Sequence, residues 1–237
     1  MEIAPPMKQM GYDRAMIVFS PEGRMYQIEY ARKAVEKATT AVGIVFANGV
    51  ALVATRSMQK LLVPESIEKV SKIDEHIGSA TCGILADCRV LVDYARTRCQ
   101  VNRITYNEPI EISALVKDIC DREQRFTQMG GLRPYGVGML IAGVNEGPHL
   151  FETDPSGTLR EWKAHAIGRG SKDARKVLID EYKEGMSKDR AIDLALKSLK
   201  SGEKKLASRS VEIGIIENGK FSIIDRNTTK ELTKKYV

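Results

Sequence analysis

The chain has 237 residues, a hydrophobic fraction of 43% and a net charge of +6, which suits one sizeable domain with a full core. Its basic residues are spread out and form no nucleic-acid motif, so the hypothesis of a basic RNA-associated protein rests on charge alone. No apolar run approaches the roughly 18 residues of a membrane span and no signal peptide is evident, so we expect a cytoplasmic protein with neither nucleic acid nor membrane as a partner.

The first part of the chain predicts a turn and then a helix. Residues 1–11 contain two adjacent prolines and no periodicity, and we expect this leading segment to be mobile. Residues 20–23, Ser-Pro-Glu-Gly, are typical of a type I turn. Apolar residues then recur near helical spacing, which predicts an amphipathic helix over about residues 24–37 at the start of a single domain, residues 12–237. A helix ahead of the first long strand is unusual in a sandwich-type domain.

The remaining elements alternate between groups of strands and pairs of helices. Apolar and β-branched runs bounded by turn residues predict strands at 39–46, 50–55, 70–73, 77–85, 137–144, 148–152, 158–162, 164–167, 211–216 and 221–224. Asn48-Gly49 and Asn218-Gly219 are typical hairpin turns. Two helical patterns follow the fourth strand, and two more follow the eighth. Elements grouped in this way indicate the α+β class, with two antiparallel sheets covered by helices on both outer faces.

Three candidate capping residues and the polar tail predict where individual helices begin. Asp87 can cap the first of the paired helices, and we expect Val90 on its inner face. Ser171 and Ser187 can cap the two later helices. The polar tail from Thr228 is expected to form a short helix.

Neither the cysteines nor the histidines form a metal-binding pattern. No Cys-x-x-Cys pair occurs, which predicts reduced and mostly buried thiols at Cys82, Cys88, Cys99 and Cys120. The scattered His76, His149 and His165 do not suggest a metal site, and we expect no cofactor. His165 lies between alanines in an apolar strand, which is typical of a satisfied core histidine. Residues 168–170, Gly-Arg-Gly, resemble part of a phosphate cradle, but the missing spacing favours a connecting loop.

Two threonines at the start of the first strand are the sharpest catalytic candidates. A threonine acts as a nucleophile when cleavage frees its α-amine to serve as the base, and Lys69 is a candidate lysine to assist Thr39 or Thr40. The second strand, however, ends without a carboxylate, and Ala38 closes a well-formed helix where cleavage would have to occur. Threonines are also good strand formers. A threonine hydrolase processed at Thr39 or Thr40 is therefore kept as the alternative function.

The chain resembles the proteasome α-subunit family, and its archaeal members most. The resemblance rests on residues 12–14 (Tyr-Asp-Arg), 19–24 (Phe-Ser-Pro-Glu-Gly-Arg), 27–31 (Gln-Ile-Glu-Tyr-Ala) and 130–136 (Gly-Gly-Leu-Arg-Pro-Tyr-Gly). Weaker matches extend it to residues 66–69, to residues 83–87 and to the final hairpin, so it covers nearly the whole chain.

The resemblance implies a four-layer αββα fold of the N-terminal-nucleophile hydrolase type and a non-catalytic role. Seven such chains would form a homo-heptameric ring that caps the proteasome β-subunits, which hold the threonine protease sites. Residues 1–11 would then block the entrance to folded chains and admit unfolded polypeptides for ATP-dependent degradation. An activator ATPase or another cap would dock its C-terminal tails on the ring.

The resemblance also assigns three groups of residues. The gate cluster comprises Tyr12, Asp13, Arg14, Pro21 and Tyr30. The activator-tail pocket comprises Lys69, Arg32, Ala38 and Ile84, with the Lys69 ammonium pairing with the tail carboxylate. Ala38 departs from the glycine that is common at this pocket wall. The entrance constriction comprises Met129, Gly130 and Gly131, although the end of a helix would explain these glycines equally well.

Overall fold

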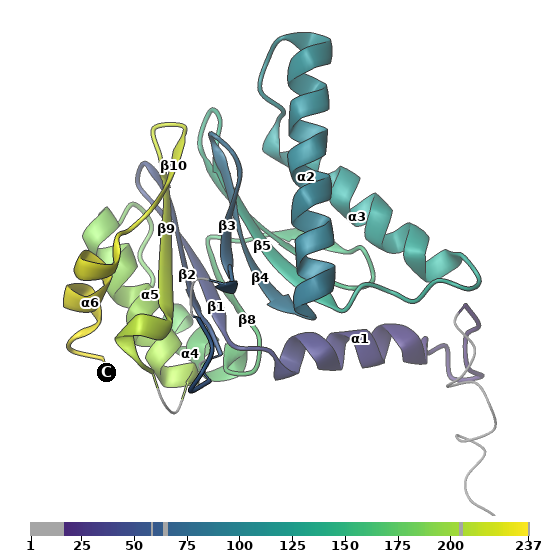
Figure 1. The fold of residues 1–237 in the computed structure, drawn as a ribbon, viewed down its shortest axis with the longest axis horizontal. Coiled ribbons are helices and arrows are strands. Elements are labelled where there is room, and N and C mark those ends of the chain that lie inside the picture. Colours follow the sequence, from purple (N-terminus) through teal and green to yellow (C-terminus); the bar gives the residue numbers. More distant parts are fainter. Residues whose placement is uncertain (1–16, 58, 64–65, 204–205, 237) are drawn as a thin grey trace, which may run out of the picture.

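Two five-stranded antiparallel sheets lie face to face in the computed structural model, which describes residues 17–57, 59–63, 66–203 and 206–236 (Figure 1). The first sheet has the order β10-β9-β2-β1-β8. Its strands are β1 (Ala41–Phe46), β2 (Gly49–Thr55), β8 (Ala164–Ile167), β9 (Val211–Glu217) and β10 (Lys220–Ile223). Asn218 and Gly219 both have positive φ, at 52° and 68°, as the predicted hairpin turn requires.

The second sheet has the order β3-β4-β5-β6-β7. Its strands are β3 (Val70–Asp74), β4 (Ile77–Gly83), β5 (Val137–Val144), β6 (Pro148–Thr153) and β7 (Leu159–Glu161). Every expected strand is present, with ends that move by at most two residues. The patterns of alternating and continuous apolar residues were therefore sufficient to locate the strands.

Helices cover the outer face of each sheet (Figure 1). The second sheet packs against α2 (Leu85–Tyr106) and α3 (Ile112–Gln128), and the first against α4 (Ser171–Glu181) and α5 (Lys188–Gly202). The tail forms α6 (Arg226–Thr233). A short 3-10 helix, η3 (Ser208–Ser210), directly precedes β9. The four-layer αββα architecture is thus confirmed. No helix in the described ranges combines the length and the apolar character needed to cross a bilayer.

Three apolar layers hold the sandwich together. One lies between each sheet and its helices, and the third lies between the two sheets. The layer between the sheets is rich in small side chains, with Ala41, Ala54, Ala80 and Ala142 fully buried beside larger aliphatic residues. The four cysteines are free and buried within these layers, as expected.

Helix α1 (Tyr26–Lys37) crosses one end of the sandwich, beneath the ends of β4 and β5 (Figure 1). It begins two residues later than expected, because Arg24 is held in the preceding turn. The amide of Ser20 donates to the carbonyl of Arg24 at 2.9 Å, and the Ser20 hydroxyl accepts from the Arg24 amide at 3.2 Å. Val35 packs against Gly138, where a Cβ would approach the Val35 Cγ1 to 2.9 Å, so the glycine lets the helix approach the sheet.

Three local expectations are wrong. The residue before α2 is Ile84, so Asp87 lies in the first helical turn and makes a different contact, described below. Gly170 precedes α4, which places Ser171 inside the helix instead of at its cap. Val90 is exposed, not on the inner face of α2. Ser187 does cap α5, accepting from the amide of Arg190.

One carboxyl group on α3 is buried without a charged partner. Glu123 is 0% exposed, and its Oε1 accepts only a long hydrogen bond of 3.4 Å from the Thr153 hydroxyl. Its Oε2 has no hydrogen-bond partner among the described residues. Burial, together with the nearby Asp154, raises the pKa of Glu123 well above 4.5 against the opposing bond from Thr153. Folding therefore favours the protonated form of the Glu123 carboxyl group.

Replacement of Glu123 by glutamine should stabilise the fold above pH 5. A pKa that folding raises contributes stability below the ordinary value of 4.5, and that contribution is lost as the pH rises through the folded-state pKa. Glu123→Gln keeps a polar group of the same shape without an ionisable proton. We expect it to raise the free energy of unfolding by about 1–2 kcal/mol at pH 8 and to leave it nearly unchanged at pH 4. Urea unfolding at a fixed protein concentration measures both values, with the exposed Glu146→Gln as control. An equal effect at the two pH values would contradict the assignment.

Candidate functional site

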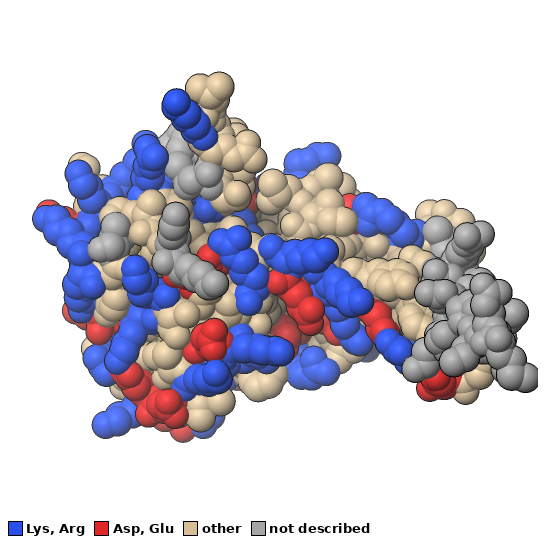
Figure 2. All heavy atoms as spheres, turned by 90° about the horizontal axis from the view of Figure 1, so that it is seen from below, with Lys and Arg blue, Asp and Glu red and all other residues tan. Residues whose placement is uncertain are grey.

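Most of the predicted site residues gather at the end of the sandwich that α1 crosses. Figure 1 shows α1, the start of α2 and the segment after α3 at this same end. Seen from that side in Figure 2, lysine and arginine side chains are spread across much of the face, with acidic side chains between them.

The Thr40 hydroxyl is fully engaged by its own chain. Thr40 is 0% exposed, and both its amide and its hydroxyl donate to the Glu203 carboxylate, at 2.9 and 2.7 Å. The hydroxyl also accepts from the amide of Gly170 at 3.0 Å. Arg169 holds the same carboxylate from its other side. Burial alone would raise the pKa of Glu203, but the bonds from Arg169 and Thr40 outweigh it and lower that pKa.

The segment at residues 168–170 is a connecting loop, as the sequence favoured. The amide of Arg169 donates to the carbonyl of Ala38 at 2.9 Å, and the amide of Gly170 is bonded to Thr40. Gly168 has a φ of +94°, and a Cβ there would lie within 3.1 Å of the backbone of residues 38–40. The amides that would cradle a phosphate are therefore used to hold the start of β1.

Thr39 continues directly from α1 through Ala38. The amide of Ala38 donates to the carbonyl of Val35 at 3.1 Å. The carbonyl of Thr39 accepts from the Cys82 thiol at 3.0 Å and faces the Lys69 ammonium at 3.4 Å. The structure therefore brings Lys69 to Thr39, as the threonine hypothesis required, but to its carbonyl.

Lys69 is buried directly ahead of β3. It is 3% exposed, and its amide donates to Glu212 at 2.8 Å. The ammonium group faces the Thr39 carbonyl and, at 3.8 Å, the Cys82 sulfur. No carboxylate of a described residue lies within 4.0 Å of it, because Glu212 pairs instead with Arg56 at 3.0 Å. A buried ammonium with such weak partners favours an anion nearby.

Two of the other predicted pocket residues are chain neighbours of residues that contact Lys69. Ala38 is half-buried and directly precedes Thr39. Ile84 is 41% exposed at the start of α2, two residues beyond Cys82. A cavity of about 340 Å³ opens beside them, between residues 66–68 and the first turns of α2. Its lining includes Glu68 and Leu85, the immediate chain neighbours of Lys69 and Ile84, but neither of those two residues themselves.

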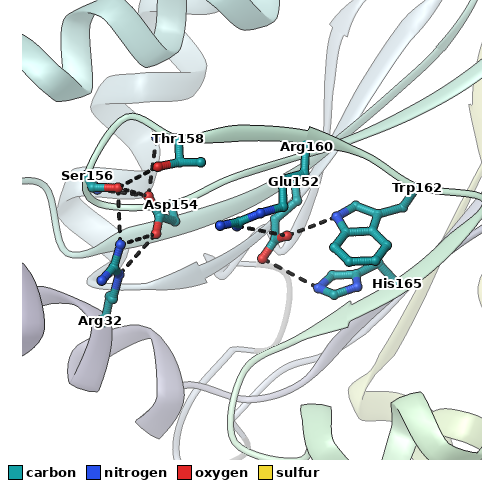
Figure 3. A network of polar contacts seen from close by, with 8 residues as sticks. All are labelled: Arg32, Glu152, Asp154, Ser156, Thr158, Arg160, Trp162 and His165. Atoms are coloured by element: carbon teal, nitrogen blue, oxygen red, sulfur yellow. Dashed lines mark hydrogen bonds and ion pairs between the residues drawn. The ribbon is translucent and has the colours of Figure 1, made fainter.

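Arg32 is bound elsewhere. Its guanidinium donates to the Asp154 carboxylate at 3.0 and 2.8 Å and to the Ser156 hydroxyl at 3.2 Å, which ties α1 to the β6–β7 turn (Figure 3). Burial raises the pKa of Asp154, but the bonds from Ser156 and Arg32 outweigh it, and the net pKa is lowered. The structure therefore does not join Arg32 to Lys69.

His165 is a satisfied core histidine, as predicted. It is buried, and its Nε2 lies 3.4 Å from Oε1 of Glu152. The indole of Trp162 stacks on the imidazole, with ring centroids 4.2 Å apart, and donates to the other carboxylate oxygen of Glu152 at 2.9 Å (Figure 3). These contacts link β8 of the first sheet to β6 of the second sheet.

Only two of the five gate residues can be located. Tyr12, Asp13 and Arg14 lie outside the described residues. Pro21 lies in the exposed turn ahead of α1, which is closed by a 2.8 Å bond from the Gly23 amide to the Ser20 carbonyl. Tyr30 is half-exposed on α1 and stacks with Tyr26 at 6.4 Å between ring centroids.

The predicted constriction residues form a turn directly after α3. Met129 closes the helix with a bond from its amide to the carbonyl of Arg125 at 3.2 Å, and its own carbonyl accepts from Leu132 at 3.3 Å. Gly131 has a φ of +85°, and a Cβ on either Gly130 or Gly131 would meet no atom of a described residue within 4 Å. The glycines thus project into open space in the isolated chain.

Sequence reasoning missed the ion pairs that hold this end together. Glu203 received no role although it binds Thr40, and Arg133 none beyond its place in a motif although it binds Asp87 at 2.6 and 2.7 Å. Glu203 lies 163 residues from Thr40 and Arg133 lies 46 residues from Asp87. One signal in the sequence could have pointed to this ion pair. Arg133 is a charged residue that follows two glycines and directly precedes Pro134, in a segment where the backbone conformation is restricted.

Comparison with known proteins identifies the chain's relatives over its whole length. Residues 35–216 match the family model for proteasome subunits, and residues 12–34 match the model for the N-terminal signature of A-type proteasome subunits. A proteasome alpha subunit of Methanoregula boonei is 52% identical over 235 residues, covering 98% of this chain and 97% of the relative. That of Archaeoglobus fulgidus is 48% identical over 229 residues, covering 96% and 91%.

Loss of the Glu203 carboxylate should destabilise the start of β1. Glu203→Gln leaves the Arg169 guanidinium without its counter-ion and weakens both bonds from Thr40, so we expect the free energy of unfolding to fall by about 2–4 kcal/mol at pH 7. Because folding lowers the pKa of Glu203, its contribution is present above the ordinary 4.5 and is lost as the pH falls through the folded-state value. The variant should therefore lose less stability than wild type on acidification below pH 4.5.

Urea unfolding at pH 7 and pH 3.5 measures both effects on the Glu203→Gln variant. Glu184→Gln is the matched control, since Glu184 forms an exposed ion pair with Lys163 at 2.6 Å. Exposed pairs contribute about 0–1 kcal/mol. Equal destabilisation by the two substitutions would mean that the Glu203 network does not hold β1.

Proposed function

The chain belongs to the proteasome subunit family, in its α branch, and from this premise we propose that it is a non-catalytic α-subunit of the proteasome core particle. In this role seven copies form an outer ring that stacks on the β-subunits. The particle degrades unfolded polypeptides in the cytoplasm, and the α-ring controls their entry. ATP-dependence is supplied by a separate activator ATPase that docks on the ring.

The absence of a catalytic role is supported by the surroundings of the two threonines. The Thr40 hydroxyl is bonded to Glu203 and Gly170, which leaves it unable to approach a substrate. Thr39 is linked through Ala38 to a complete helix, so its nitrogen is an amide instead of the free amine that an N-terminal nucleophile requires. Lys69 does reach Thr39, as the alternative threonine hydrolase requires, but it contacts the carbonyl of that residue and not a nucleophilic hydroxyl or a free amine.

The proposal that activator tails dock on this chain rests on one observation, the environment of Lys69. Its buried ammonium faces only a carbonyl and a thiol within the described part of the chain. A tail carboxylate would replace the long 3.4 Å contact to a carbonyl with a hydrogen bond between two charged groups, which is typically about 2.7–2.9 Å long. Ala38 and Ile84 would form apolar walls, and the basic character of the surrounding face would attract the negatively charged terminus (Figure 2).

The role of Arg32 in that pocket is restricted by its own contacts. Since its guanidinium is already bound to Asp154 and Ser156, we propose that Arg32 fixes α1 in place as one wall of the pocket. Tail binding would then depend on Arg32 through the position of α1. Residues 1–11 precede this end of the chain, and we propose that they form the gate together with Tyr12, Asp13, Arg14, Pro21 and Tyr30, above a constriction at Met129, Gly130 and Gly131.

Loss of the Lys69 ammonium should abolish tail-dependent stimulation. Lys69→Met keeps the buried aliphatic volume and removes the charge, and truncating one partner of a buried charge pair costs about 2 kcal/mol or more, or about 30-fold in affinity. Binding of a synthetic activator-tail peptide to the particle assembled with its β-subunits measures the loss. Lys72→Met is the matched control, since Lys72 is exposed three residues further on and pairs with Glu75. Undiminished peptide binding by Lys69→Met would refute the docking role.

Removal of the leading segment should open the particle. A chain lacking residues 2–11 is expected to assemble normally and to raise hydrolysis of a long unfolded substrate several-fold, because the barrier at the entrance is gone. Hydrolysis of a tripeptide substrate, which passes a narrow opening more easily, should change less. Native mass spectrometry verifies assembly. Unchanged rates for both substrates in an intact particle would exclude the gate.

A further inference from the structure

Asp87 and Arg133 form a bidentate ion pair between α2 and the segment that follows α3. The Arg133 Nη1 and Nη2 donate to the two carboxylate oxygens of Asp87 at 2.6 and 2.7 Å. The amide of Gly136 donates to the same carboxylate at 3.0 Å. Parallel bonds of this kind fix orientation as well as distance. We call these three residues the α2 clamp.

The environment of the α2 clamp makes it stiff. Asp87 is buried, whereas the Arg133 side chain lies more than half exposed above it. Burial alone would raise the pKa of Asp87, but Arg133 and the Gly136 amide outweigh it, and the net pKa is lowered. A buried carboxylate that keeps its charge needs these donors, so the segment cannot leave α2 without exposing an unpaired charge.

One end of the α2 clamp adjoins the proposed tail pocket. The amide of Ile84 donates to the carbonyl of Gly136 at 2.9 Å. A Cβ on Gly136 would come within 2.7 Å of the Ile84 side chain, so the pocket wall rests directly on this glycine. Gly83 lies equally close, since a Cβ there would come within 1.9 Å of the same carbonyl. Ile84 and Gly136 are therefore in direct contact through both a hydrogen bond and close packing.

The other end of the α2 clamp adjoins the proposed constriction. Arg133 follows Gly131 by two residues, a span of roughly 7 Å at most. The constriction turn is attached to α3 on one side through Met129 and to the clamp on the other. Between the clamp residues Arg133 and Gly136, Tyr135 is held by Arg122, which donates to its hydroxyl at 3.1 Å, and by Phe126 at 4.5 Å between ring centroids. Within the described residues, no atom packs against the position of a Cβ on Gly130 or Gly131 in the turn itself.

We propose that the α2 clamp transmits tail docking at Ile84 to the entrance constriction at Met129, Gly130 and Gly131. Asp87 and Arg133 are positioning residues in this scheme and touch neither the tail nor the substrate. The inference rests on the proposed function, because it takes the tail pocket and the constriction as its two sites. Coupling of this kind requires a structural element whose conformation depends on both sites. The proposed element is the α2 clamp, which contacts Ile84 through Gly136 and the constriction turn through Arg133.

The test compares tail binding with tail-dependent stimulation in the assembled particle. Asp87→Asn removes the charge from the clamp while keeping its shape. We expect a synthetic activator-tail peptide to bind this variant within about threefold of wild type, while its stimulation of unfolded-substrate hydrolysis falls at least about fivefold. Arg133→Lys keeps the charge but not the bidentate geometry and should give an intermediate loss. Asp118→Asn is the matched control and should behave as wild type, since Asp118 pairs with Arg98 at 2.5 Å between α2 and α3, away from both sites.

Two outcomes separate the inference from the proposed function. If the peptide fails to stimulate even the wild-type particle, the proposed docking role fails and the inference fails with it. If wild type and Asp87→Asn are stimulated equally, the inference alone is overturned.

Hydrogen exchange on the wild-type particle decides the case in which Asp87→Asn does not assemble. Addition of the tail peptide should change exchange at the Gly136 amide and across residues 129–133 by at least about threefold, with residues 112–128 of α3 unchanged. Unaltered exchange at both places overturns the inference.

Discussion

The close packing of the two sheets is the constraint on which the rest of this structure depends. Alanines on both inner faces let the strands approach, and the fully buried layer between them leaves no room for unpaired polar groups. Polar residues at the rim of that layer must therefore be satisfied by specific partners. Thr40, Lys69 and Glu203 meet this demand at the end crossed by α1, and their contacts fix where β1 begins. The proposed tail pocket lies at this same end of the sandwich.

Thr40 and Lys69, two of the three polar residues at that rim, have their hydrogen-bonding capacity filled to different degrees. Thr40 has both its hydrogen-bonding capacities filled by its own chain, which makes it a structural residue. Lys69 keeps long contacts to a carbonyl and a sulfur, so it retains a capacity for an anion that the described residues do not supply. The Thr40 hydroxyl is fully hydrogen-bonded, whereas the Lys69 ammonium can still bind an anion. This combination favours the proposed recognition of a carboxylate over the cleavage of a bond.

The sequence was sufficient for the fold but not for the contacts of the site. Strand and helix positions follow from periodicity and turn residues, which are local properties, and the family motifs implied the four layers. The cap assigned to Asp87 was wrong because a carboxylate near a helix start serves either the helix or a distant arginine, and only the fold brings Arg133 to it. The burial of Lys69 could not be predicted for the same reason, since burial at a strand edge depends on what crosses that edge. Thr40 and Glu203 meet across 163 residues, a distance at which no spacing rule applies.

Helix α1 also bears on how the chain behaves on its own. Ile28 is its single buried residue, and Arg32 attaches it through one partly exposed ion pair, which salt screens. Just ahead of it Phe19 is 62% exposed, beside the similarly exposed Ile17 and Val18. A helix with so little of its own core takes part of its free energy from whatever covers it. If neighbouring chains cover α1, the helix would be less stably folded in a dilute solution of separate chains than in a concentrated one. The stability of α1 would then depend on protein concentration.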